Sequence, residues 1–192
     1  MELVKNIKQA KIMKYVFFAL LGSILLAISS KIKIPFYPVP MTMQTLVVLL
    51  IGVVFGWKLG VATITLYLFE GIVGLPVFAG TPEKGIGLAY FSGPTMGYLL
   101  GFIPAVLISG FFKVNLKYNL FYRLILNFLL FTFSVSFIYI FGLTWLLNFV
   151  PIDKLWALGV YPFLPAEFLK ISILAICITI INKGNLPWRS LR

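Results

Sequence analysis

Long runs of apolar residues alternate with short segments that hold most of the charged residues of this chain. A helix of about 20 apolar residues is long enough to cross a lipid bilayer. The pattern therefore predicts an all-α integral membrane protein, a six-transmembrane-helix bundle. The expected spans are Tyr15 to Ser30, Pro40 to Phe55, Leu59 to Leu75, Thr95 to Phe112, Phe121 to Leu147 and Pro162 to Ile181.

Residues 1–192 are expected to form a single transmembrane domain. A basic segment, 1–14, precedes the spans, which occupy about 15–182, and a short basic tail, 183–192, follows them. The lysines before the first apolar run also resemble the start of a signal peptide. Because this run is as long as its neighbours, we expect it to remain as a span.

Three connections between the runs predict specific local structure. Gly56, Trp57 and Lys58 alone separate the second run from the third, which predicts an antiparallel helical hairpin. The segment Ile34–Pro40 carries three prolines and is expected to be extended. The segment Gly74–Gly93 is rich in glycine yet apolar, so we expect it to fold back against the bundle. The last two segments indicate either a lidded pocket on the outer side or interfacial packing.

Composition supports the membrane interpretation and excludes several kinds of chemistry. Mean hydropathy is +1.05, and 11% of residues are charged, against about a quarter in soluble domains. Histidine is absent and Cys177 is the one cysteine, which excludes an intramolecular disulfide, histidine-based metal sites and the usual hydrolase triads. No phosphate-binding loop motif is present, so the chain is not expected to use ATP itself. A membrane enzyme with Glu70 or Glu167 as general acid remains an alternative.

The net charge of +11 reflects topology rather than nucleic-acid binding. With six spans and the N and C termini cytoplasmic, eleven Lys and Arg residues lie inside and four lie outside, and Lys170 lies in the membrane. Such an excess of inner positive charge is the usual bias of membrane proteins.

Two features within the spans suggest specific contacts. Glu167 and Lys170 are three residues apart in the last run and so share one helix face, where charges in lipid usually mark a functional site. They are suited to bind the N–H groups and the oxygen of an amide-like ligand, or else form a mutual ion pair that fixes helix packing. Ala19, Ser23 and Ala27 form a stripe of small residues that lets another helix approach closely, from this chain or from a partner.

Five motifs, in order, are similar to those of the BioY family. They are PVPMTMQTL (Pro38 to Leu46), GLPVFAG (Gly74 to Gly80), GPTMGYLLGF (Gly93 to Phe102), GLTW (Gly142 to Trp145) and LPAEFLK (Leu164 to Lys170). The resemblance implies a six-helix S component of an energy-coupling-factor (ECF) transporter that captures biotin from outside. It implies partners as well: a transmembrane coupling protein and two cytoplasmic ATPase subunits.

The resemblance also implies roles for individual residues. Glu167 matches an acidic position that is usually aspartate in the family, and Lys170 matches its lysine. Gln44 matches a glutamine, which bonds the ligand or caps the broken backbone nearby. The stripe of Ala19, Ser23 and Ala27 matches the surface that meets the coupling protein. The aromatic candidates for packing against biotin, or for core packing, are Phe78, Tyr98, Tyr139 and Trp145.

Two departures from the family pattern affect the loops. Met96 stands where GPTGGY has a glycine, and Thr81–Lys84 replaces part of a glycine-rich stretch, so loop contacts are not carried over.

The expected function is biotin uptake by a multi-pass protein of the cytoplasmic membrane that serves as the high-affinity substrate-binding S component. No cofactor is expected, because ATP is used only by the partner subunits, and no enzyme activity is expected. The alternatives are an S component for another vitamin, such as riboflavin or thiamine, and a membrane protein of the same fold without a transport role.

Overall fold

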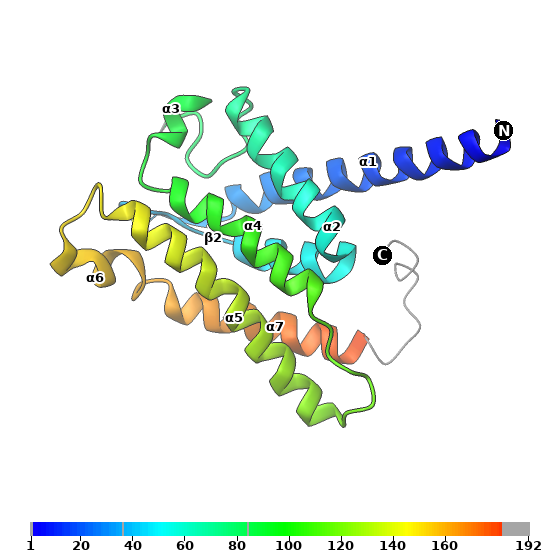
Figure 1. Ribbon diagram of the computed structural model, residues 1–192. Coiled ribbons are helices and arrows are strands. Elements are labelled where there is room, and N and C mark those ends of the chain that lie inside the picture. Colours follow the sequence, from blue (N-terminus) through cyan, green and yellow to red (C-terminus); the bar gives the residue numbers. More distant parts are fainter. Residues whose placement is uncertain (1, 36, 84, 182–192) are drawn as a thin grey trace.

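The protein is described by a computed structural model that covers residues 2–35, 37–83 and 85–181. Lys84 and the basic tail 183–192 lie outside the described residues, as do the side chains of residues 1–8, 10 and 11. Five long helices make up most of the structure (Figure 1): α1 (Glu2–Lys31), α2 (Gln44–Ile72), α4 (Met96–Phe111), α5 (Leu120–Leu146) and α7 (Leu164–Ile181). Shorter elements connect them: β1 (Lys33–Ile34), β2 (Met41–Thr42), α3 (Leu88–Phe91), η1 (Ile152–Lys154) and α6 (Leu155–Gly159).

Four of these helices contain stretches long and apolar enough to cross a membrane. The stretches are Ile12–Lys31, Gln44–Ile72, Leu120–Leu146 and Leu164–Ile181, whereas the apolar helix Met96–Phe111 is shorter. The mostly helical, membrane-type architecture is thus confirmed. The count of six spans and the side on which the termini lie stay predictions.

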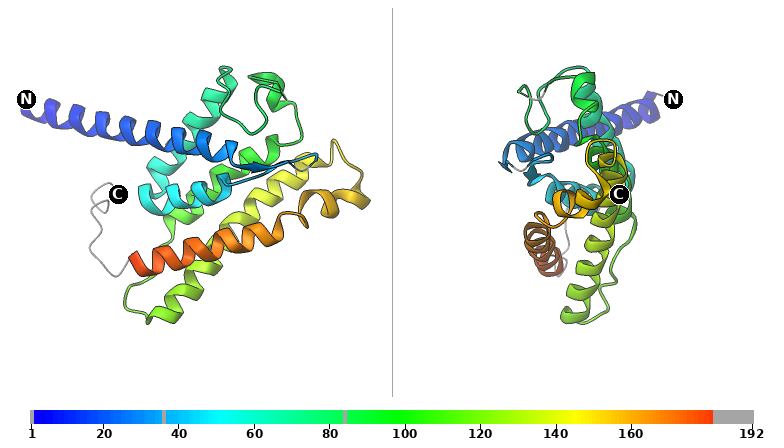
Figure 2. Two further views of the ribbon diagram at one scale, coloured as in Figure 1. Left: turned by 180° about the vertical axis from the view of Figure 1, so that it is seen from behind. Right: turned by 90° about the vertical axis from the view of Figure 1, so that its left-hand side faces the viewer.

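The helices pack in the order of the chain. α1 lies along one flank of α2 and α4, and the pair α5 and α7 lies on the other flank (Figure 2). The N-terminal part of α1 projects beyond the bundle (Figure 1). The basic segment 1–14 is helical from Glu2 and continues without a break into the first candidate span, Ile12–Lys31. It contains no glycine or proline that would interrupt that helix.

The helix α2 consists of two antiparallel arms that meet at Gly56. This residue has φ 76° and ψ 170°, a conformation that suits glycine because it has no Cβ. Gln44 Nε2 lies 2.7 Å from the Tyr67 hydroxyl, and a Cβ built on Gly60 would lie 3.6 Å from Gly52 Cα. A straight helix would hold both pairs far apart, since it rises 1.5 Å per residue. The predicted hairpin is therefore confirmed.

The first arm of α2 begins four residues later than predicted. Met41 and Thr42 pair with Lys33 and Ile34 in an antiparallel two-stranded sheet, so the helix starts at Gln44 rather than at Pro40. The described residues of the proline-rich segment contain no helix, as expected, but residues 37–39 form bends, so the segment is not extended throughout.

The segment Gly74–Gly93 folds back on the bundle, as predicted. The Ser30 hydroxyl donates to Val77 O over 2.7 Å, and Lys31 Nζ donates to Phe78 O over 2.9 Å. Phe78 is fully buried and stacks on Tyr90, with ring centroids 4.9 Å apart. The apolar side chains of this loop thus pack against protein.

Close backbone contact joins α4 to α5. A Cβ on Gly101 would lie 2.6 Å from Ile138 Cα, and one on Gly97 would lie 2.4 Å from Phe141 O. Glycine at these positions lets the two helices touch. The contact places Tyr98 of α4 and Tyr139 of α5 side by side, with ring centroids 6.0 Å apart.

Candidate functional site

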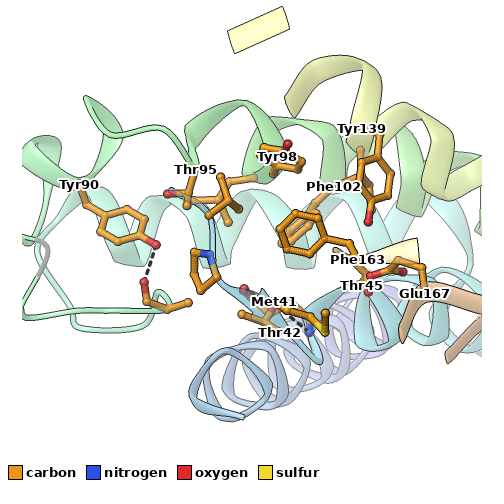
Figure 3. Close-up of a pocket in the computed structure, with 16 residues that line it drawn as sticks. Met41, Thr42, Thr45, Tyr90, Thr95, Tyr98, Phe102, Tyr139, Phe163 and Glu167 are labelled. Carbon is orange, nitrogen blue, oxygen red and sulfur yellow. Dashed lines mark hydrogen bonds between the residues drawn. The ribbon is translucent and has the colours of Figure 1, made fainter. Parts of the chain in front are cut away.

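A cavity lies where the β2 strand, the Gly74–Gly93 segment and the long helices α2, α4, α5 and α7 converge (Figure 3). Its volume is about 60 Å³, measured as the space open to the centre of a water molecule. Most of its wall is apolar or aromatic, as is usual for small-molecule sites. Its lining residues are Val39, Pro40, Met41, Thr42, Gln44, Thr45, Ala79, Tyr90, Thr95, Tyr98, Leu99, Phe102, Ile138, Tyr139, Phe163 and Glu167.

Glu167 supplies the one acidic side chain of this cavity. It lies in the first turn of α7, and its side chain is 7% exposed. Its Oε1 atom accepts hydrogen bonds from Thr45 Oγ1 over 2.9 Å and from Lys170 Nζ over 2.6 Å. Its Oε2 atom is buried without a partner, and no other buried side-chain nitrogen or oxygen shares this state in the part of the chain described. A buried carboxylate oxygen without a hydrogen-bond donor costs free energy, so a donor from a ligand would stabilise this atom.

Lys170 donates a hydrogen bond to Glu167 but does not itself line the cavity. Besides Glu167, its ammonium donates to Thr42 O over 2.7 Å and to Thr45 Oγ1 over 3.0 Å. A lysine ammonium has three hydrogens, and these three bonds use them all. The two residues thus form the ion pair that was one alternative of the sequence analysis. One carboxylate oxygen stays free, so the other alternative, ligand binding, remains open.

Gln44 lines the cavity from the start of α2. Its Nε2 donates to the Tyr67 hydroxyl, and its Oε1 accepts from Thr42 Oγ1 over 3.2 Å. Tyr67 in turn donates to Val77 O over 2.9 Å. Gln44 thus connects the broken backbone before α2 to the Gly74–Gly93 loop, and one of its amide hydrogens is not used in these bonds.

Two of the four aromatic candidates line the cavity. Tyr98 donates from its hydroxyl to Gly159 O over 2.9 Å, which orients its ring. Tyr139 directs its hydroxyl toward the side of the cavity where Phe163 and Glu167 lie (Figure 3).

The other two aromatic candidates are not among the lining residues. Phe78 lies within the folded loop, between Tyr67 and Tyr90, while its neighbour Ala79 lines the cavity. Trp145 donates from Nε1 to Gly93 O over 2.9 Å and so fixes the end of the loop.

The small-residue stripe of α1 faces this chain's own α2. Ala19 and Ser23 are buried, Ala27 is partly buried, and the Ser23 hydroxyl donates to Glu70 Oε2. The exposed face of α1 carries large apolar residues instead: Val16, Phe17, Leu20, Leu21, Ile24, Leu25 and Ile28.

The sequence analysis did not single out Thr42 and Thr45, which hold the Glu167–Lys170 pair. Both threonines lie beside Gln44 in the motif PVPMTMQTL, so the motif itself was the available signal. Tyr90, Thr95 and Phe163, which also line the cavity, gave no separate signal.

The chemistry of the cavity wall suits a largely apolar ligand that brings at least one N–H group, while its volume of about 60 Å³ is below the about 300–1,000 Å³ typical of small-ligand sites. Glu167 Oε2 is an acceptor in a dry site, where such bonds discriminate strongly. Within the described ranges, no group of three acidic, histidine or cysteine side chains could hold a metal ion.

Comparisons with known proteins agree on one family. The chain is 34% identical over 161 residues to the "Probable biotin transporter BioY" of Pyrococcus horikoshii, covering 84% of this chain and 91% of that protein. It is 34% identical over 158 residues to the biotin transporter BioY2 of Lactococcus lactis, covering 81% and 83%.

A crystal structure of the S-component for biotin from an ECF-type ABC transporter has a similar fold. Its TM-score is 0.71 at 26% sequence identity, with 97% of this chain and 98% of that chain covered. The BioY family model matches residues 4–185, nearly the whole sequence. On these grounds the chain belongs to the BioY family.

Proposed function

We propose that this protein takes up biotin as the substrate-binding S component of an ECF transporter. The family membership and the names of the relatives support biotin as the substrate. The observation that carries the proposal is the buried, unpartnered Oε2 atom of Glu167 at the cavity wall. The ureido group of biotin offers N–H donors to such an acceptor.

The proposed ligand contacts use hydrogen-bonding groups at the cavity wall that the protein's own bonds do not occupy. In this proposal Glu167 Oε2 accepts a ureido N–H, and the Tyr139 hydroxyl and the unused Gln44 amide hydrogen, both at the cavity wall, donate to the ureido oxygen. Lys170 acts through Glu167, because its three hydrogens are engaged by protein oxygens. Tyr98, Phe102 and Phe163 supply apolar contact for the ring and the tail. Phe78 and Trp145 keep a supporting role by holding the loop in place.

The membrane arrangement belongs to the same proposal. The two arms of α2, α1, α4, α5 and α7 give six spans, with both termini cytoplasmic as the charge distribution favours. The cavity then opens to the outer side under the Gly74–Gly93 loop. A transmembrane coupling protein and cytoplasmic ATPase subunits would supply the energy, since this sequence has no phosphate-binding loop motif. Docking through the α1 stripe remains part of the proposal, although Ala19 and Ser23 are buried in this chain.

Titration of the purified protein with a vitamin panel tests the function. Biotin should bind, and riboflavin and thiamine should not. A biotin analogue methylated on its ureido nitrogens should bind far more weakly, because it cannot donate to Glu167 Oε2. Tight binding of another vitamin, or chemical change of biotin on incubation, would contradict the proposal.

A further inference from the structure

A second cavity lies at the opposite end of the same helices, at the break in α2. Its volume is about 260 Å³, measured in the same way, which is just below the about 300–1,000 Å³ typical of small-ligand sites. Gly56 and its neighbours form one wall, and the C-terminal end of α4 forms another. The lining residues are Tyr15, Phe55, Gly56, Trp57, Lys58, Leu59, Gly110, Phe111 and Lys113.

Direct backbone contact brings the two lysines of this cavity together. A Cβ on Gly110 would lie 2.6 Å from Trp57 N and 2.8 Å from Gly52 O, so only glycine lets α4 approach the α2 turn this closely. Lys58 follows that turn and Lys113 follows the end of α4. The fold thus places two ammonium groups on one small cavity.

The described side chains leave the positive charge of this cavity without a carboxylate partner. Lys58 and Lys113 are its charged lining residues, and among the residues whose side chains are described no carboxylate forms an ion pair with either. The tail 182–192 contains no acidic residue. The carboxylates whose side chains are described lie toward the end of the Glu167 cavity: Glu70, Glu83, Asp153 and Glu167.

Two of the lining side chains are of a type that membrane proteins place at the membrane–water interface. Trp57 and Tyr15 are amphipathic aromatic residues of the kind enriched at this depth. Lys58 Nζ lies 5.4 Å from the centroid of the Trp57 ring, which favours an ammonium at the rim of the cavity. The second arm of α2 also starts here, and the first N–H groups of a helix favour an anion.

We propose that this cavity binds the phosphate of an anionic phospholipid headgroup, with Lys58 and Lys113 as its two cationic contacts. A basic pocket between membrane helices, with no acidic partner and an aromatic rim, fits that chemistry. The exposed apolar side chain of Phe111 continues the rim and offers a surface to the acyl chains. The site is separate from the Glu167 cavity and does not depend on the ligand bound there.

The test uses the full chain purified in detergent and titrated with short-chain phosphatidylglycerol or phosphatidylcholine, with bound lipid counted by native mass spectrometry. Phosphatidylglycerol should bind more tightly. The double variant Lys58→Gln, Lys113→Gln should bind it about 25-fold more weakly, about fivefold for each lysine. The charge-matched control Lys117→Gln, Lys154→Gln should change binding less than about threefold. Lys58→Arg with Lys113→Arg keeps both charges and should retain binding.

Four results would overturn the proposal. Equal loss in the control double variant would indicate diffuse attraction, and equal affinity for the two lipids would remove anion selectivity. Displacement of the lipid by millimolar inorganic phosphate would assign the cavity to free phosphate. Unchanged lipid binding in the Lys58→Gln, Lys113→Gln variant, with loss of assembly with the energising subunits, would assign it to a protein contact.

Discussion

The Thr45 hydroxyl donates a 2.9 Å hydrogen bond to the Glu167 carboxylate across a sequence separation of 122 residues. The same hydroxyl accepts a bond from Lys170, so three side chains form one closed group. This arrangement occupies one carboxylate oxygen and leaves the other for a ligand. Thr45 is therefore a positioning residue for the proposed site.

Replacing Thr45 tests that role. Thr45→Val keeps the shape of the side chain but removes the hydroxyl, and should weaken biotin binding by about tenfold, the value of one hydrogen bond to a charged group. Thr45→Ser keeps the hydroxyl and should bind nearly as the parent does. Isothermal titration measures both. Equal affinity of the valine and serine variants would remove Thr45 from the site.

Replacing Glu167 and Lys170 separates ligand binding from ion pairing. Glu167→Gln should weaken biotin binding by about 1–3 kcal/mol, roughly 5- to 150-fold, because a charged acceptor is lost. Lys170→Met leaves a buried carboxylate without its cation and should lower stability by about 3–5 kcal/mol. The double variant should regain stability yet bind more weakly than Glu167→Gln alone. A stable double variant with normal biotin affinity would show that the pair serves packing alone.

Replacing Ser23 tests the two roles of the α1 stripe. Ser23 is buried and donates to Glu70, so Ser23→Leu should lower the thermal midpoint and weaken biotin binding together. The control Ile24→Ala, on the exposed face of α1, should leave both unchanged. Because the proposal also assigns the stripe to docking, uptake should fall further than the loss of biotin affinity accounts for. Uptake that falls only in proportion to biotin affinity would make the stripe an internal packing contact and remove docking from the proposal.

Replacing Gly56 tests the reversal in α2. Its φ of 76° and ψ of 170° belong to a region that only glycine adopts readily, so Gly56→Ala should destabilise the fold by about 1–3 kcal/mol. Thr65→Ala, on the exposed side of the second arm, should have little effect. Thermal unfolding in detergent compares the two variants. An unchanged midpoint for Gly56→Ala would mean that the turn accepts a side chain.

Labelling of introduced cysteines tests the membrane topology. In a Cys177-free background, a cysteine near Asp153 should react with an impermeant thiol reagent added outside whole cells. Cysteines near Lys58 or Lys117 should react only after the membrane is opened. The opposite labelling pattern would reverse the proposed orientation of the termini.

The helical part of the fold was predictable because its signals are local. Long apolar runs indicate membrane-type helices, and Gly56, Trp57 and Lys58 are too few residues for anything but a sharp reversal. The Glu167–Lys170 contact was predictable as well, since residues three apart on a helix are neighbours. Family motifs, rather than spacing, indicated Gln44.

Other features depend on contacts that no local pattern encodes. The β1–β2 pairing has strands of two residues each, too short to show alternation. Thr45 meets Glu167 only through the packing of α2 beside α7. In the irregular Gly74–Gly93 loop no period fixes which side chain points inward, so Phe78 was a candidate while its neighbour Ala79 lines the cavity.

The Tyr67 hydroxyl has a consequence for how a ligand enters. It accepts from Gln44 at the cavity wall and donates to Val77 in the Gly74–Gly93 loop, so one oxygen atom joins the cavity wall to that loop. If the loop were displaced, Tyr67 would lose its acceptor, and Gln44 would lose the fixed partner that orients its amide. In the proposed site, admission of a ligand past this loop and recognition of the ligand by Gln44 would therefore depend on the same pair of hydrogen bonds.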